Sequence, residues 1–150
     1  MRVVIQRVKH AAVHISNECV GEINQGLLIL LGVEHEDSQN DADYLVQKIS
    51  NLRIFSDADG KMNLSVQDTD GQFLVVSQFT LHANTKKGNR PSYMRAARAE
   101  HAIALYEYFI DSLQKTSTRI VQSGRFGADM QVSLVNDGPV TIIIDSKEDM

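Results

Sequence analysis

The chain has 150 residues, which suits one domain, and its 43% hydrophobic and 23% charged residues are the composition of an ordinary globular protein. The formal net charge of -4 excludes a protein that coats nucleic acid generally, although it allows one that grips a short nucleic-acid end. Cys19 is the only cysteine, which excludes an intramolecular disulfide and a cysteine-based zinc cluster and suits a reducing cytosol.

The beginning of the chain has the patterns of β-strands. Residues 2–8 (RVVIQRV) alternate in polarity, and residues 11–15 and 18–23 follow as further short strands, with Gly21 as a turn or bulge. Residues 26–33 (GLLILLGV) form a continuous apolar run between glycines, short enough to be a strand that is covered on both faces.

A helix is predicted after Ser38, which suits its N-cap, because apolar residues then recur every three or four positions: Ala42, Leu45, Ile49 and Leu52. Residues 56–63 have turn chemistry, and residues 71–81 (GQFLVVSQFTL) are expected to be a mostly apolar strand. A longer helix is expected over about residues 92–115, with one apolar side: Ala99, Ala102, Ile103, Tyr106, Phe109 and Leu113.

The C-terminal segment is expected to contain two strands, residues 129–135 and 139–145, joined by the tight link Asn136-Asp137-Gly138. Strands therefore dominate both ends of the chain, with two helices between them. We expect an α/β (α+β) fold, a single domain of curved, largely antiparallel β-sheets that form a barrel-like core with two main helices.

The N-terminal segment is interrupted by Arg2, Arg7 and Lys9 and lacks a signal-peptide core and cleavage site. No apolar run approaches the ~18 residues that a membrane span needs. Without a repeat or linker in the sequence, we expect one soluble, cytoplasmic domain that covers residues 1–150.

The segment SQFT, residues 77–80, places hydrogen-bonding side chains at the end of an apolar strand. Strand alternation would put Gln78, Thr80 and His82 on one face and Ser77 and Phe79 on the other. Such a set suits a site at a sheet edge, but a strand that runs out into solvent has the same pattern. A Thr80 nucleophile with His82 as base is not favoured, because no acid partner, nucleophile elbow or N-terminal threonine is indicated.

The five histidines show no metal-ligand spacing, and EHED, residues 34–37, is interpreted as a solvated acidic turn in preference to a metal site. The sequence has no zinc-protease, zinc-deaminase, P-loop or dinucleotide-binding motif. We therefore expect no cofactor and no metal.

Residues 86–98 (KKGNRPSYMRAAR) carry a charge of +5 within a negatively charged protein, from Lys86, Lys87, Arg90, Arg95 and Arg98. An ordinary solvated start of a basic helix would have this composition. The alternative is a phosphate grip that uses the N–H groups of the helix N-terminus, with Tyr93 available for stacking on a base.

The motifs SQFT and GPVT, residues 77–80 and 138–141, occur together with KKGNRPSY and GRFGADMQVSLVNDGPVT in one chain. With LRIFSDADGKMNLSV and the opening VVIQRV, they resemble the D-aminoacyl-tRNA deacylase (D-tyrosyl-tRNA deacylase) family nearly from end to end. Either short motif alone would be a weak signal, whereas the pair at this separation is a specific one.

The resemblance implies a carboxylic ester hydrolase that releases a D-amino acid from the 3′-terminal adenosine of tRNA. It also implies that glycine is accepted, including glycine mischarged onto alanine tRNA. The family acts as a homodimer without metal, and SQFT of one subunit meets Gly-Pro of the other at the interface. The implied catalytic residues are Ser77, Gln78, Phe79 and Thr80.

Gly138-Pro139, with a cis bond, is implied by the resemblance to bind substrate and to reject L-aminoacyl-tRNA. A stiff main chain would exclude an L side chain where a flexible side chain would yield. Arg7 is implied to brace this element, although a surface arginine on a strand would look the same in the sequence. Lys86, Lys87, Arg90 and Arg95 are the expected tRNA-binding residues.

For the chemistry we expect positioning and oxyanion stabilisation by the backbone N–H groups of Phe79 or Thr80, with the terminal ribose hydroxyl helping to activate water. Two other functions stay open from the residues alone. One is a non-catalytic module that binds an RNA 3′ end, and the other is a hydrolase of small D-amino acid esters or amides.

Overall fold

The long strand β1 (Arg2–Ile15) is the centre of the sheet in the computed structural model, which describes residues 1–150. It pairs antiparallel with β2 (Glu18–Ile23), with β3 (Gly26–Gly32) and with β8 (Gln131–Asp145). The first half of β1 lies between β3 and β8, and its second half lies between β2 and β8.

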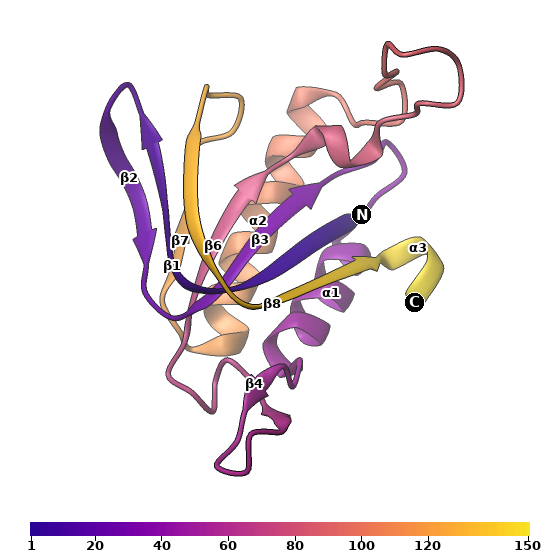
Figure 1. Cartoon of the computed structure of the whole chain (residues 1–150). Helices are drawn as coiled ribbons and strands as arrows, with labels where there is room; N and C mark the ends of the chain where they lie inside the picture. The colour runs from indigo at the N-terminus through magenta and orange to yellow at the C-terminus, as the bar shows by residue number, and fades with distance from the viewer.

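The sheet continues from β3 through two parallel pairings, first with β6 (Gln72–Ser77) and then with β7 (Val121–Ser123). The strand order is β2-β1-β3-β6-β7, with β8 paired to β1 outside this path. A Cβ built on Gly21 of β2 would lie 2.7 Å from the carbonyl oxygen of Ser123 in β7, so glycine lets the two ends of the order approach each other. The sheet therefore curls into the nearly closed, barrel-like shape of Figure 1.

Helices α1 (Gln39–Asn51) and α2 (Ala99–Ser117) pack on the sheet and against each other (Figure 1). The larger core cluster joins them to the sheet through side chains such as Leu45, Ile49 and Phe109. A short helix α3 (Ser146–Asp149) ends the chain, and the hairpin of β4 (Phe55–Ser56) and β5 (Met62–Leu64) stands apart from the main sheet. None of the helices has the length and hydropathy of a membrane span.

Strand β3 is buried on both faces, as its continuous apolar run predicts. Leu27, Ile29 and Leu31 belong to the cluster beneath the helices, whereas Leu28 belongs to a second cluster with Val8 and residues of β2 and β6. The predicted start of α1 is also confirmed, because the carboxylate of Asp41 accepts hydrogen bonds from the backbone N–H and the hydroxyl of Ser38.

The C-terminal segment differs from the two predicted strands, because β8 is one continuous strand whose two halves pair with the same partner, β1. The predicted tight link at Asn136-Asp137-Gly138 is therefore no hairpin turn. The pairing with β1 shifts register between Gln6 and Val8 and again between Val8 and His10. These bulges lie opposite the middle of β8, so both halves of β8 stay paired with β1. The two strands expected over residues 2–8 and 11–15 likewise form one strand.

The longer helix begins at Ala99, seven residues later than expected. The preceding backbone is held by other segments: Asn84 and Ser92 exchange two hydrogen bonds of 2.8 and 2.9 Å, and Ala97 donates to Val33. The backbone groups of Ser92 and Ala97 therefore hydrogen-bond to other segments and are not part of a helix.

Candidate active site

The candidate site lies where the parallel strands β3 and β6 end at the same edge of the sheet. Leu31 of β3 pairs with Ser77 of β6, and the Gln78 N–H donates a 2.8 Å hydrogen bond to Leu31 O. The pairing of the two strands ends here, and the carboxyl ends of parallel strands are a common place for a ligand site. The SQFT motif therefore lies at the carboxyl end of these two strands, which is one of the two settings that the sequence left open.

The backbone of SQFT leaves the strand conformation at Gln78, which corrects the predicted alternation of faces. Phe79 opens a short 3₁₀ turn, η1 (Phe79–His82), so Gln78, Thr80 and His82 do not share a strand face. The amide of Gln78 donates to Thr80 Oγ1, and the Phe79 side chain is 53% exposed.

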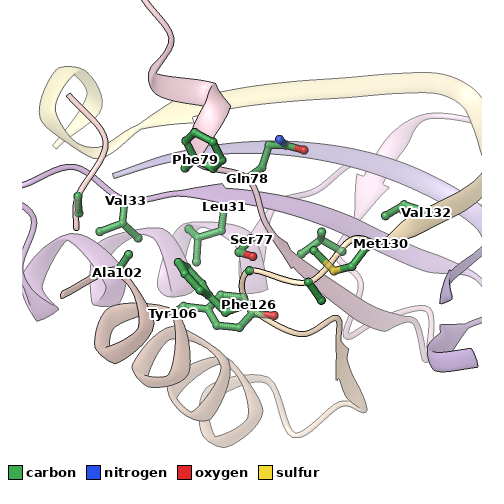
Figure 2. A pocket seen from close by; sticks show the side chains of 14 residues that line it. Leu31, Val33, Ser77, Gln78, Phe79, Ala102, Tyr106, Phe126, Met130 and Val132 are labelled. Atoms are coloured by element: carbon green, nitrogen blue, oxygen red, sulfur yellow. The ribbon is translucent and has the colours of Figure 1, made fainter. Parts of the chain in front are cut away.

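A cavity of about 300 Å³ opens beside this turn (Figure 2). Ser77, Gln78 and Phe79 line part of it, and the other lining residues, mostly apolar, come from the end of β3, from α2 and from the segment between β7 and β8 with the start of β8. In Figure 2 the rings of Tyr106 and Phe126, whose centroids are 5.9 Å apart, lie below Ser77. An apolar pocket with a few polar groups at its mouth suits a small planar ligand.

His82 makes no hydrogen bond to Thr80. Its side chain is fully buried, and neither ring nitrogen makes a hydrogen bond. Its Nδ1 lies 3.3 Å from Glu34 Oε1, outside hydrogen-bond geometry. Burial lowers the pKa of His82, although the Glu34 carboxylate opposes this shift.

The predicted solvated acidic turn at residues 34–37 is wrong for two of its members. Glu34 is 9% exposed and Asp37 is 3% exposed. Asp37 forms an ion pair of 2.6 Å with the N-terminal ammonium group and accepts the Glu34 N–H, whereas Glu34 pairs with the Arg95 guanidinium. Nowhere do three or more His, Cys, Asp or Glu side chains gather in a way that would hold a metal ion.

The Gly138-Pro139 peptide bond is cis and lies on the exposed middle part of β8. Arg7 reaches it from β1: its Nε donates a 3.0 Å hydrogen bond to Asp137 O, and its Nη1 donates to Ile54 O. The Arg7 side chain is only 10% exposed, so it is no surface arginine. Neither residue of the Gly-Pro pair lines the cavity beside SQFT of the same chain.

The basic segment is divided between two settings. Lys86, Lys87 and Arg90 are exposed on a loop that the Asn84–Ser92 bridge closes, and this loop projects from the upper right of Figure 1. Arg95, in contrast, forms its ion pair with Glu34. Tyr93 packs edge-on against Phe79, with ring centroids 5.1 Å apart.

The family model for D-Tyr-tRNA(Tyr) deacylase matches residues 4–145 of the chain. The chain belongs to the D-Tyr-tRNA(Tyr) deacylase family. Among the relatives named D-aminoacyl-tRNA deacylase, the one from Akkermansia muciniphila is 61% identical over 148 residues, which cover 99% of both chains. That of Porphyromonas gingivalis is 59% identical over 97% of both chains.

Two solved structures have the same fold. One, described as "c-Myc DNA Unwinding Element Binding Protein", is 42% identical with a TM-score of 0.91, over 97% of this chain and 98% of the other. The second, titled as a structural analysis of a probable eukaryotic D-amino acid tRNA deacylase, is 16% identical with a TM-score of 0.82, over 95% and 97%. At that identity the second likeness concerns the fold alone.

Several residues of this deacylase-family chain were not predicted from the sequence as parts of this site, namely Tyr106, Phe126 and Met130 of the cavity and the buried Glu34. The glycines around Phe126 were the available signal. A Cβ on Gly124 would lie 2.5 Å from the sulfur of Met130, and Gly127 has a φ of +77°. The glycines thus allow the segment to fold tightly against the mouth of the cavity.

Proposed function

We propose that the chain hydrolyses the ester bond of D-aminoacyl-tRNA and releases the free D-amino acid and tRNA. The observation that carries the proposal is the SQFT turn at the mouth of an apolar cavity, in a chain whose family model matches residues 4–145. The cavity would receive the terminal adenosine, and the ester would lie over the turn. Glycine, which has no side chain, would be accepted as well, including glycine on alanine tRNA.

The proposed chemistry is positioning combined with oxyanion stabilisation. The first N–H groups of a helical turn have no partner within the turn, so those of Phe79 and Thr80 are suited to a developing oxyanion. The RNA ribose hydroxyl next to the ester would help to activate the attacking water. Thr80 has no buried base beside it, because His82 is turned toward Glu34.

Chiral selection is assigned to Gly138-Pro139, with Arg7 as its brace. Because this pair does not line the cavity of its own chain, we propose that it faces the SQFT turn of a second copy in a homodimer. The exposed apolar side chains Val135 and Ile143, 54% and 65% exposed, give β8 a surface that a second copy would cover. An L side chain would then meet the main chain of the partner.

RNA binding is assigned to the exposed cations Lys86, Lys87 and Arg90, whose loop projects near Phe79 and Tyr93. The likeness to a protein named for binding a DNA unwinding element makes nucleic-acid binding without catalysis the second candidate function. It would account for the basic loop but not for the cavity beside SQFT.

One assay separates the candidates: release of tyrosine from D-Tyr-tRNA and L-Tyr-tRNA, with D-tyrosine methyl ester as a third substrate. The proposal expects release from D-Tyr-tRNA alone. Binding without release would favour the binding module, and equal activity on the methyl ester would favour a small-ester hydrolase. A D-Tyr-tRNA that ends in 2′-deoxyadenosine should react poorly; full activity on it would exclude help from the ribose hydroxyl.

A further inference from the structure

Glu34 is a buried carboxylate that links two segments of the candidate site. It follows the end of β3, it is 9% exposed, and its Oε1 contacts both the guanidinium of Arg95 and the imidazole of His82. The proposed function gives Glu34 itself no role.

The two partners of Glu34 belong to different parts of the proposed machinery. His82 is the last residue of η1, the turn that starts with Phe79 and contains Thr80. Arg95 follows the exposed basic loop, which is anchored beside Glu34 by a backbone bridge between Glu34 and Ala96 and by a 2.9 Å hydrogen bond between His35 Nε2 and Met94 O.

The buried carboxylate of Glu34 is most stable where it contacts both Arg95 and His82. Removing a charge from water is costly unless a partner compensates for it, so losing either partner is penalised. The His82 ring is packed closely between Glu34, whose Oε1 lies 3.3 Å from its Nδ1, and Gly32, where an added Cβ would lie 3.1 Å from its Nε2. Glu34 therefore holds its two neighbours in a fixed relation.

We infer that Glu34 is a positioning residue for the proposed deacylation: through Arg95 and His82 it fixes the basic loop relative to the 3₁₀ turn at Phe79. RNA bound on the loop would then present its ester at the turn in a single geometry. The inference rests on the proposed function and adds to it a role for Arg95 other than a phosphate contact.

The two roles of Arg95 predict different kinetics. As a phosphate contact, Arg95→Met would raise KM and flatten the dependence of log affinity on log salt by about 0.7, with kcat unchanged. As the partner of Glu34, it would lower kcat, because a displacement of about 1 Å costs on the order of 100-fold, whereas KM and the salt slope would stay the same.

The experiment is a double-mutant cycle on D-Tyr-tRNA hydrolysis with Glu34→Gln, Arg95→Met and the double variant. We expect each single variant to lose about 10- to 100-fold in kcat with KM within about threefold, and the double variant to lose little more than either, because both break one interaction. Asp70→Asn is the matched control, since Asp70 pairs with Arg119 at 2.6 Å but is 88% exposed and lies outside the site.

Unchanged kcat, a change confined to KM and the salt slope, or additive losses would overturn the inference. Arg95 is 59% exposed, so Arg95→Met tests the inference even if Glu34→Gln does not fold. A wild-type protein that releases no tyrosine would overturn the proposed function itself, whereas an active wild type with normal variants would overturn this inference alone.

Discussion

Arg7 Nε donates a 3.0 Å hydrogen bond to the carbonyl oxygen of Asp137, the residue before Gly138. The same guanidinium donates through Nη1 to Ile54 O, and the side chain is almost fully buried. One planar group therefore holds two backbone carbonyls that are far apart in the sequence. A lysine keeps the charge but cannot reproduce this two-directional contact.

Arg7→Lys is expected to lower the free energy of unfolding by about 2 kcal/mol, because a buried carbonyl left without a donor costs about 1–3 kcal/mol. The ratio of D-Tyr-tRNA to L-Tyr-tRNA hydrolysis should fall at least about tenfold, which corresponds to about 1.4 kcal/mol of discrimination. Denaturant unfolding and the two hydrolysis rates measure these effects. Arg53→Lys is the control, because Arg53 donates to Asn63 O on an exposed hairpin. If the ratio of D-Tyr-tRNA to L-Tyr-tRNA hydrolysis is the same in Arg7→Lys as in the wild type, Arg7 has no part in chiral selection.

Gly138→Ala is expected to destabilise the protein by about 1–3 kcal/mol. Gly138 has a φ of +126°, and an added Cβ would lie 3.0 Å from Arg7 Nη2 and 3.0 Å from Val140 Cγ2. Gly60→Ala is the matched control: its φ is also positive, at +78°, but nothing lies within 4 Å of the added Cβ. The prediction fails if the two variants have the same midpoint of thermal unfolding.

Thr80→Ala is expected to retain near-normal turnover of D-Tyr-tRNA. Thr80 Oγ1 accepts a hydrogen bond from the side-chain amide of Gln78, and neither ring nitrogen of His82 hydrogen-bonds to it. The backbone N–H of residue 80, which the substitution keeps, is the group assigned to the oxyanion. Single-turnover rates and mass spectrometry of quenched reactions measure the outcome. A loss of about 10⁴-fold, or a trapped acyl-enzyme in the wild type, would establish a threonine nucleophile instead.

Replacing both Lys86 and Lys87 with glutamine should flatten the salt dependence of tRNA binding. If about four phosphates of single-stranded RNA are neutralised, the slope of log affinity against log salt is roughly -2.8, and the loss of two contacts brings it to about -1.4. The change should be similar for every tRNA, because phosphate contacts carry no sequence information. Lys61→Gln, on the exposed turn of the β4–β5 hairpin, should leave the slope alone. An unchanged slope in the double variant would show that Lys86 and Lys87 make no contacts with RNA phosphates.

His82→Gln is expected to change how stability depends on pH. Burial lowers the pKa of His82 below its ordinary value of 6.5; the charges of Arg2 and the N-terminal ammonium group lower it further, and the Glu34 carboxylate raises it. The unfolded chain therefore binds more protons than the folded one just below pH 6.5. The folded state keeps its full stability above pH 6.5 and loses stability as the pH falls toward the lowered pKa.

Removing the imidazole should therefore reduce the slope of the unfolding free energy between about pH 5 and 7. His10→Gln is the control, because the His10 side chain is 43% exposed. Denaturant unfolding at several pH values measures the slopes, and equal slopes in the wild type and His82→Gln would contradict the prediction.

Elements whose signals are local could be predicted from the sequence. The apolar run of β3 predicts a strand buried on both faces, and Ser38 with the apolar periodicity after it predicts the start of α1, because burial and capping depend on residues a few positions apart. The SQFT and GPVT motifs, together with the longer stretches around them, indicate the family from the sequence.

The ends of the elements and the contacts between distant side chains depend on the folded chain as a whole. Strand β6 ends at Ser77, where the backbone turns into η1. Strand β8 continues through Gly138 because β1 pairs with both of its halves. Helix α2 starts later than predicted because the N–H of Ala97 donates to the carbonyl oxygen of Val33. The contact of Glu34 with Arg95 and His82 likewise joins residues about 50 to 60 positions apart. A backbone or buried charged group takes the partner that the whole fold brings within reach, and no local pattern records that choice.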